Sequence, residues 1–396
     1  MAETVDVAII GGGIAGASLA YFLGRLGVRN VLLLERSAVA AGASGRASGL
    51  VSMLTTGHPG CAALLKASAD FYASWKREID AAPAVTWVGG LRPVPEAERA
   101  DLQEELRIMR DAGHEVEILE RPAIEALVPG WDLAGIDLAA FSPRAGYIDP
   151  PAVTTALMNA ARALGVRVYQ GTDVHEVLSQ GGRVSGLRST RGEIRTGMVI
   201  AATGAWLGGS WVPVGLRNAL QPVRHMVAHL LPPASLRLPF PVTGDLLNAV
   251  YFRPEPGGLV LAAHSGVDEP APDPERFDPG ADDGYASEML ARLARRIPAM
   301  RGAQIVGGHA GVYLAGADEF PIVGRLGEMV GLYCLADTAG NGMTSSPGMA
   351  RALAETIVRG RTFTDLAPFR PGRFAEGEPI RAAYRHAGEP RGRGTR

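Results

Sequence analysis

Glycines and one glutamate near the N-terminus have the residue types and spacing to bind a pyrophosphate and a ribose. Gly11 permits a tight turn, Gly13 lets the backbone approach a pyrophosphate closely, and Gly16 allows a helix to pack against a strand. Glu35 follows the glycine turn at the sequence spacing where a carboxylate accepts hydrogen bonds from ribose hydroxyls. These residues predict recognition of the adenosine diphosphate half of a dinucleotide.

The elements that must position these residues are indicated by the flanking sequence. The β-branched run Val5–Ile10 predicts a strand that leads into the glycine turn, and the apolar pattern Ala17–Leu26 predicts the helix that follows it. A second expected strand, Val31–Leu34, ends at Glu35. A glycine turn that serves only the backbone is the alternative. The complete order of strand, turn, helix, strand and acid argues against it.

Stretches rich in small residues favour FAD over NAD. Residues 41–49 suit a backbone that runs alongside a large planar ligand, although a flexible surface loop is the alternative. The expected strand Gly192–Ile200 leads into a turn of small residues. A second glycine turn, 340–342, follows the expected strand Gly331–Leu335 and opens the helical pattern Ser346–Arg359. Such a turn can offer backbone N–H groups to an electron-rich flavin edge.

Composition narrows the class of protein. The 396 residues are 47% apolar and 20% charged with a net charge of −2, which fits a two-domain globular enzyme and gives no electrostatic reason to expect nucleic acid. Cys61 and Cys334 lack the close spacing of a metal or redox pair, so we expect no metal site and a cytoplasmic location. No secretory signal and no transmembrane segment is expected.

Several motifs occur together along the chain. They are the N-terminal fingerprint, the Gly42–Gly49 loop, Gly146-Tyr147-Ile148-Asp149-Pro150, Ala202-Thr203-Gly204-Ala205-Trp206, Asp318-x-x-Pro321-Ile322-Val323-Gly324, Gly340-Asn341-Gly342 and Asp365-Leu366-Ala367-Pro368-Phe369-Arg370. From about Val5 to Phe374 the chain therefore resembles the D-amino-acid oxidase, sarcosine oxidase and glycine oxidase family of FAD-dependent oxidoreductases.

The resemblance implies an α/β fold (α+β overall), in which a Rossmann-like FAD-binding domain is interleaved with a substrate domain built on a mostly antiparallel sheet. The implied FAD-binding domain comprises 1–82, 144–218 and 305–374, the substrate domain 83–143 and 220–304, and a flexible tail 375–396. The sequence agrees in outline. Its patterns predict amphipathic helices at Glu96–Ala112 and Ala286–Ile297 and strands at Val223–Leu231 and within Ala249–Ala263.

The resemblance also implies which residues contact FAD. They are Gly11, Gly13, Ile14, Ala15, Gly16, Glu35, Arg36, Ala43, Ser44, Arg46, Ala47, Ser48, Gly49, Leu50, Val174, Thr203, Gly204, Trp206, Gly311, Asp318, Pro321, Ile322, Gly340, Asn341, Gly342, Met343 and Thr344. Relatives that bond the flavin covalently use a cysteine near Gly311 or a histidine near Arg46. Neither residue is present there, so we expect non-covalent FAD.

Three residues of the expected central strands, Tyr251, Arg253 and His264, are the catalytic candidates. Strand alternation places Tyr251 and Arg253 on one face, where a hydroxyl beside a guanidinium suits a substrate carboxylate. His264 resembles the sarcosine oxidase histidine near flavin and substrate, and a neutral imidazole there could accept a hydrogen bond from an amine. The alternatives are purely structural roles for all three. His225 and His309 are expected to be structural.

The chain departs from the resembled family at positions that concern oxygen and carboxylate. Sarcosine oxidases carry a lysine that helps oxygen react where this chain has Val260, so a dehydrogenase is expected, unless the strand alignment is shifted by one residue. Thr344 stands where they carry a carboxylate-binding lysine, and Gly311–Leu314 lacks the arginine of glycine oxidases. Either Arg253 or Arg46 then binds a carboxylate, or the substrate is not a simple amino acid.

The leading hypothesis is oxidation of a secondary amine or amino acid, of the N-methyl or cyclic imino acid class, by hydride transfer to flavin N5. One alternative is a 2-hydroxy acid dehydrogenase, which residues 342–347 faintly resemble. Another is a flavin-carrying β-type subunit of a larger amine dehydrogenase or oxidase. The expected partners are a small amine or amino acid, an electron acceptor (a quinone, a carrier protein or O2) and, in the last case, a partner subunit.

Overall fold

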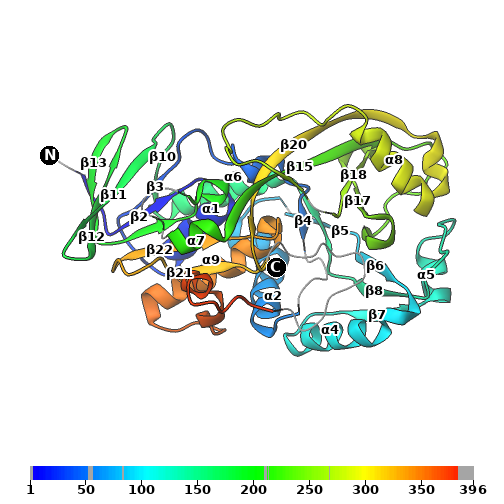
Figure 1. The fold of residues 1–396 in the computed structure, drawn as a ribbon, viewed down its shortest axis with the longest axis horizontal. Coiled ribbons are helices and arrows are strands. Elements are labelled where there is room, and N and C mark those ends of the chain that lie inside the picture. Colours follow the sequence, from blue (N-terminus) through cyan, green and yellow to red (C-terminus); the bar gives the residue numbers. More distant parts are fainter. Residues whose placement is uncertain are drawn as a thin grey trace.

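Two lobes lie side by side along the longest axis of the molecule (Figure 1). The computed structural model describes residues 3–51, 57–82, 84–208, 212, 214–266 and 268–381. One lobe is built on a mainly parallel sheet covered by helices, and the other on a larger, mostly antiparallel sheet. This arrangement confirms the expected α/β architecture with a Rossmann-like part and an antiparallel sheet.

The parallel sheet forms because its strands are apolar throughout. In the described residues it has six strands in the order β10 (Arg167–Tyr169), β3 (Val31–Leu34), β2 (Val7–Ile10), β14 (Val199–Ala201), β22 (Leu332–Ala336) and β21 (Ile322–Arg325). Only the last pair is antiparallel. Every residue of β2 and β3 is buried, as is typical of a parallel sheet covered on both faces.

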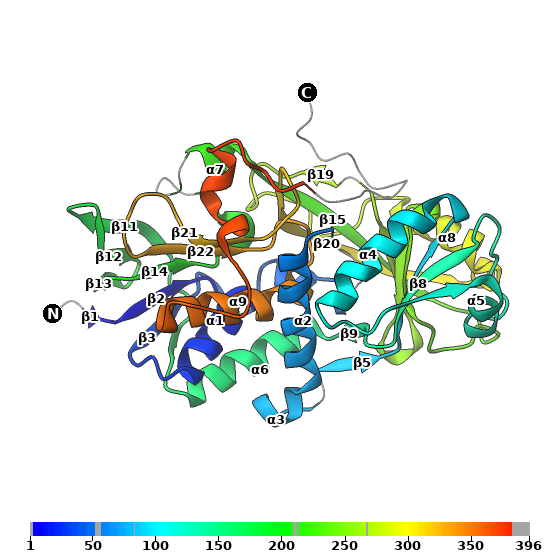
Figure 2. The same cartoon turned by 90° about the horizontal axis from the view of Figure 1, so that it is seen from below.

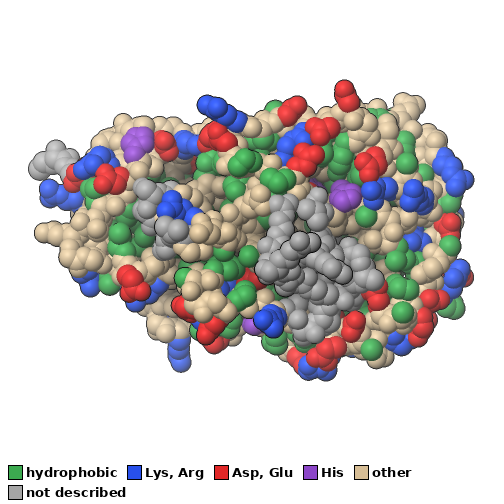
Figure 3. Space-filling model, in the orientation of Figure 1, with side chains coloured by type: hydrophobic (Ala, Val, Ile, Leu, Met, Phe, Trp, Pro, Cys, Tyr) green, Lys and Arg blue, Asp and Glu red, His purple; other side chains and the backbone are tan. Residues whose placement is uncertain are grey.

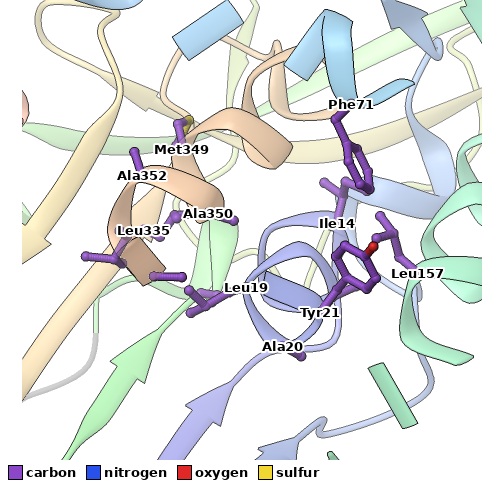
Figure 4. Close-up of a cluster of buried hydrophobic side chains, with 14 of the residues drawn as sticks. Ile14, Leu19, Ala20, Tyr21, Phe71, Leu157, Leu335, Met349, Ala350 and Ala352 are labelled. Atoms are coloured by element: carbon purple, nitrogen blue, oxygen red, sulfur yellow. The ribbon is translucent and has the colours of Figure 1, made fainter. Parts of the chain in front are cut away.

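Helices from distant parts of the chain cover this sheet. They are α1 (Ile14–Arg25), α2 (Pro59–Ala73), α6 (Pro150–Ala163) and α9 (Gly342–Arg359), with the short α3 (Trp75–Ile79) and α7 (Val214–Asn218) beside them. Side chains such as Tyr21, Phe71, Leu157 and Met349 from the four long helices meet in one buried cluster (Figure 4). α2 lies between α9 and α4 (Arg99–Asp111) of the second lobe, and so joins the two lobes (Figure 2).

One strand expected from the sequence is divided, and another begins later than expected. Gly192–Ile200 becomes β13 (Gly192–Arg195) and β14. The strand expected at Val5–Ile10 begins at Val7 as β2, and a short strand, β1 (Glu3–Thr4), precedes the expected run. β1 and β13 belong to a second sheet with β12 (Arg183–Ser189) and β11 (Val174–Gln180). The hydroxyl of Thr196 donates towards Asp6 O at 3.2 Å and Met198 O at 3.0 Å, and this turn ends one strand before the next begins.

The second lobe is built on the large, mostly antiparallel sheet. In the described residues its order is β19 (Glu269–Pro270), β15 (Leu220–Leu231), β18 (Val260–His264), β17 (Val250–Pro254), β16 (Val242–Asp245), β6 (Gly90–Val94), β8 (Leu138–Ser142) and β7 (Glu117–Glu120), with β20 (Gln304–Gly316) paired to β15. The strand pair expected within Ala249–Ala263 is confirmed as β17 and β18. A small third sheet joins β4 (Leu50–Val51), β9 (Gly146–Ile148) and β5 (Val85–Trp87).

The expected helices are confirmed with shifted ends. Glu96–Ala112 consists of a 3-10 turn, Glu96–Glu98, followed by α4, and Ala286–Ile297 is α8 (Tyr285–Arg296). α9 begins at Gly342, before the expected Ser346, because the glycine turn itself enters the helix. α5 (Arg121–Leu127) completes the second lobe. Within the described ranges, no helix combines the length and apolar character needed to cross a membrane.

The boundaries of the two expected domains stay a prediction. β20 pairs with β15 along the large sheet, although the expected FAD-binding domain resumes at residue 305. The expected tail begins with residues that contact the body of the protein: Arg370 pairs with Glu376 and Glu378, and Ile380 N donates to Asp318 Oδ2 at 2.9 Å. Residues 382–396 of that tail lie outside the described residues.

A buried ion pair fixes α8 to the large sheet. Arg296 on α8 is 3% exposed and donates from Nε to Asp245 Oδ2 at 2.8 Å, while Asp245 itself is fully buried. Arg296 also donates to Asp132 O. Because both charges are desolvated, each depends on the other.

We expect Arg296→Met to lower the free energy of unfolding by about 3–5 kcal/mol, because it leaves the Asp245 carboxylate buried without its cation. Urea denaturation measures the change. The double variant Asp245→Leu/Arg296→Met removes both charges and should recover most of the loss. A single variant that unfolds at the wild-type urea concentration would contradict the assigned role of the pair.

Candidate active site

A cavity of about 940 Å³ lies between the carboxyl ends of the parallel strands and the large sheet. Residues that follow β2, β3, β14 and β22 line one side, and residues of β15, β17, β18 and β20 line the other. Ligands of open parallel sheets bind at these strand ends. Over the outer face drawn in Figure 3, Lys and Arg side chains are interspersed with Asp and Glu.

The glycine turn after β2 fits a pyrophosphate. Gly11 has φ +110°, and a β-carbon there would lie 2.4 Å from Ala202 O. A β-carbon on Gly16 would lie 1.9 Å from Gly11 O, so only glycine lets α1 begin this close to the strand ends. The first turn of α1 has no intrahelical acceptors for its N–H groups, and these groups border the cavity.

Glu35 is placed as a ribose ligand would be. It follows β3 and borders the cavity, and its Oε2 accepts a hydrogen bond from Gly12 N at 2.6 Å. Its Oε1 accepts from Ser37 N at 2.7 Å. Ser44 Oγ accepts from Ile14 N at 2.9 Å, which ties the 41–49 loop to the start of α1. A helix start, an acid and small residues together match the adenosine diphosphate part of FAD.

Most residues assigned to FAD by resemblance come together at this cavity. Those that line it are Gly11, Gly13, Ile14, Ala15, Glu35, Arg36, Ala43, Ser44, Arg46, Ala47, Ser48, Leu50, Val174, Thr203, Gly204, Trp206, Gly311, Asp318, Pro321, Gly340, Asn341, Gly342, Met343 and Thr344. Gly16, Gly49 and Ile322 are not brought to the cavity wall. Gly16 and Gly49 instead allow close backbone contacts, and Ile322 is buried within β21.

Asp337, which sequence reasoning missed, shapes the second glycine turn. Its Oδ1 accepts from Asn341 N at 2.8 Å and its Oδ2 from Ser345 Oγ at 2.7 Å. Burial raises the pKa of this carboxyl, and the hydrogen bonds oppose that shift. The turn is thereby held at the start of α9, where Gly342 and Met343 have no intrahelical acceptor for their N–H groups. An acid directly before a glycine-rich helix start was the available signal.

A hydrogen-bonded chain of four side chains occupies the large-sheet side of the cavity. His225 Nε2 lies 2.8 Å from the Tyr251 hydroxyl, and His225 Nδ1 lies 2.7 Å from Asp268 Oδ1. The Tyr313 hydroxyl donates to Asp268 Oδ2 at 2.7 Å. All four residues line the cavity. Tyr251 was expected there, whereas His225 was expected to be structural and Asp268 and Tyr313 were missed because strand pairing, not sequence spacing, brings them together.

Arg253 is not brought together with Tyr251 at the cavity, which corrects the expectation that it binds a substrate carboxylate. Its Nε donates to Ser48 O at 2.5 Å, its NH1 donates to Pro254 O at 2.9 Å, and its guanidinium lies 4.8 Å from the Tyr147 ring centre. The side chain is buried and does not line the cavity. Arg253 therefore stabilises the 41–49 loop from the side that faces away from the cavity.

His264 does line the cavity, at the end of β18. Its Nδ1 accepts from Gly266 N at 2.8 Å, and burial lowers the pKa of its imidazole. Because Nδ1 accepts, the proton of the neutral ring is on Nε2. The nitrogen left at the cavity wall is therefore a donor, which corrects the expectation that His264 accepts a hydrogen bond from an amine.

Val260 does not face the cavity. Val260 and Ala262 pack under α8, whereas Leu261 and Ala263 pack with Tyr251 on the cavity side. The comparison with an oxidase lysine therefore cannot rest on Val260. A simpler observation replaces it: the whole sequence contains only Lys66 and Lys76. Both belong to helices α2 and α3, and neither lines the cavity.

Comparisons with known proteins find a matching family model, similar curated proteins and a similar solved structure. Residues 6–356 match the family model described as FAD dependent oxidoreductase (DAO). Mitochondrial dimethylglycine dehydrogenase of Rattus norvegicus is 28% identical over 394 residues, covering 95% of this chain and 45% of the relative. Glycine oxidase of Geobacillus kaustophilus is 28% identical over 377 residues, covering 93% and 97%. The solved structure of L-proline dehydrogenase from P. horikoshii has a TM-score of 0.86 at 22% identity, covering 96% and 100%.

The fold and the cavity define a dinucleotide-binding oxidoreductase of the flavin type. The chain belongs to the FAD dependent oxidoreductase (DAO) family, and its cofactor is FAD. The chain spans about half the length of the curated relatives it first matches. Within the described residues, no cluster of His, Cys, Asp and Glu is arranged to hold a metal ion.

We expect FAD to be bound without a covalent bond. Cys61 on α2 borders the cavity and is the thiol to check, since Cys334 is buried within β22. Acid precipitation should release essentially all flavin into the supernatant, with the same yield from wild type and Cys61→Ser. Flavin fluorescence that stays with the denatured protein would contradict this, and its loss in Cys61→Ser would identify the bond.

Proposed function

We propose that this protein oxidises a secondary amine or amino acid, of the N-methyl or cyclic imino acid class. When bound, the flavin supplies the acceptor for hydride from the carbon beside the substrate nitrogen. The observation that carries the proposal is the chain Tyr251–His225–Asp268 at the cavity wall. The names of two relatives fit this class, since dimethylglycine is an N-methyl and L-proline a cyclic amino acid, whereas glycine, in the name of a third, is a primary amino acid.

The polarity of this chain follows from its acceptors. An ionised Asp268 carboxylate can only accept, so His225 Nδ1 carries a proton and donates to it. In neutral His225, Nε2 then accepts from the Tyr251 hydroxyl. The Ser48 side chain also hydrogen-bonds to the Tyr251 oxygen. The remaining lone pair of that oxygen can accept an N–H of the substrate. A wall of this polarity favours an amine that must give up a proton.

The same chain gives the proton a path. An ammonium substrate must lose a proton before hydride can leave the neighbouring carbon. Burial raises the pKa of Tyr251, so the phenol stays protonated and acts as a relay, passing its own proton to His225 as it accepts one. Asp268 then stabilises the imidazolium at 2.7 Å.

A substrate carboxylate has one remaining arginine candidate. Among the described cavity-lining residues, the arginines are Arg36 and Arg46, and Arg36 is paired with Glu275 and stacked 4.9 Å from the Trp206 ring centre. Arg46 lies on the 41–49 loop. Its NH1 donates to Ala41 O and, at 3.4 Å, towards Gly42 O, and its guanidinium lies 5.8 Å from the Phe277 ring centre. We therefore assign carboxylate recognition to Arg46.

A dehydrogenase fits the site better than an oxidase. With Lys66 and Lys76 as the only lysines of the sequence, no lysine of this chain is at the cavity to stabilise developing superoxide. Electrons would then pass to a quinone or a carrier protein.

Anaerobic mixing with sarcosine, dimethylglycine, proline, glycine, D-alanine and 2-hydroxyglutarate tests the substrate class. We expect a secondary or N-methylated amine to bleach the flavin band, because the amine N–H can engage Tyr251, and the hydroxy acid to leave it unchanged. Bleaching by 2-hydroxyglutarate alone would replace the proposal by a hydroxy acid dehydrogenase. Wild-type bleaching rates in an Asp268→Asn variant would remove the role of the chain.

Admitting air to the bleached protein separates dehydrogenase from oxidase. Slow return of the flavin colour, accelerated by an added quinone or carrier, is the expected result because no lysine assists oxygen. Rapid return with peroxide would show an oxidase and overturn the argument from Lys66 and Lys76.

A further inference from the structure

Behind the cavity, Glu255, His229 and His309 form a second hydrogen-bonded chain that the proposed reaction does not use. Glu255 follows β17, His229 is on β15 and His309 is on β20. His229 Nδ1 lies 2.8 Å from Glu255 Oε2, and His229 Nε2 lies 3.0 Å from His309 Nδ1. The two rings are stacked, with centroids 5.2 Å apart.

The chain ends on the loop that lines the FAD cavity. His309 Nε2 lies 3.1 Å from Arg46 O. Glu255 also binds Arg253, whose Nε donates to Ser48 O at 2.5 Å. The loop lies flush against β20, since a β-carbon on Gly311 would come within 3.0 Å of Arg46 Cβ. Two backbone carbonyls of this loop thus depend on one half-buried cluster of charged and titratable side chains.

Counting protons shows what the three hydrogen bonds require. The carbonyl of Arg46 can only accept, so His309 Nε2 must carry a proton. One proton must lie between the two imidazoles and one between His229 and Glu255. Two neutral imidazoles supply two protons, and three are needed. Burial opposes ionisation of Glu255, but its hydrogen bond with His229 and the charges around it hold its pKa below the usual range. The third proton is therefore present when the histidine pair carries one shared positive charge.

We propose that Glu255, His229 and His309 are a proton-dependent positioning unit. The unit holds residues 43–48 of the 41–49 loop in the conformation that binds FAD. With three protons the unit makes all three hydrogen bonds. When one proton leaves, one hydrogen bond must break, and the bond to Arg46 O weakens with it. The inference rests on FAD occupying the cavity and is independent of the substrate.

The groups around His309 determine the direction in which the pKa of its imidazole is shifted. The charged groups that act on His309 are His229, Glu255 and Arg46, and Glu255 also faces Arg253. Burial lowers the pKa of His309, which moves loss of the proton towards lower pH. Below this pKa all three hydrogen bonds are made, and the contact with the loop weakens as pH rises. FAD should therefore bind more tightly at the acidic end of the range.

The dissociation constant of FAD from the apoprotein, measured across about pH 5 to 8, tests the proposal. For wild type we expect it to rise by about three- to tenfold with pH, the effect of one hydrogen bond. His309→Gln replaces the ring by an amide that can donate to Arg46 O without titrating, so its affinity should not change with pH. His309→Leu has no donor and should bind FAD weakly at every pH. His114→Gln, which changes a histidine outside the cavity wall, should keep the wild-type dependence.

A second measurement on wild type does not depend on a variant folding. Nitrogen-15 shifts of histidine-labelled apoprotein should show His229 and His309 losing one proton together. Independent titration of the two rings, a flat wild-type affinity, or a pH dependence that persists in His309→Gln would each overturn the proposal. Failure of the substrate test would leave these results unchanged, so the two proposals can fail separately.

Discussion

The start of α1 can lie against the strand ends only because Gly16 has no side chain. A β-carbon there would sit 1.9 Å from Gly11 O, and a β-carbon on Gly11 would meet Ala202 O at 2.4 Å. These contacts bring the N-terminus of α1, β2 and β14 together at one point. The helix N–H groups, Glu35 and the Thr203–Trp206 turn then converge on the same cavity. The other residues of the site are arranged around these close contacts of Gly11 and Gly16.

The second constraint is the position of the large sheet relative to the N-terminus of α1. α2 spans both lobes, and the Ala43–Ser48 loop is held to β17 and β20 by Arg253 and His309. The loop therefore contacts both the parallel-sheet side and the large-sheet side of the cavity. It carries backbone atoms toward the cofactor and receives hydrogen bonds from the sheet that carries Tyr251. A shift of this loop would move cofactor and substrate groups together.

Local sequence predicted the elements whose pattern is set by neighbours in the chain. The glycine turn, β3 and α8 were predicted because apolar periodicity and backbone demands are local. The division of Gly192–Ile200 was missed because local sequence does not reveal where the chain passes from one sheet to another.

The site was predictable only where a motif carried it. Alternation put Tyr251 and Arg253 on one face of a strand, yet it could not show that Ser48 O takes the guanidinium. Asp268 and Tyr313 reach His225 through the pairing of β15 with β20 and β19, which no spacing in the sequence encodes. Long-range pairing is therefore what separates the cofactor site, which is largely local, from the substrate site, which is not.

The most direct test of the central claim is the pH dependence of the limiting rate of anaerobic flavin reduction by an amine, compared between wild type and Tyr251→Phe. Tyr251→Phe keeps the ring beside His225 and removes only the hydroxyl that passes the proton. The account predicts that the variant reduces flavin about 10²-fold more slowly at neutral pH, and that it recovers only as pH approaches the pKa of the free amine. Identical rates and profiles in the two proteins would contradict it, because the amine would then lose its proton without the Tyr251–His225–Asp268 chain.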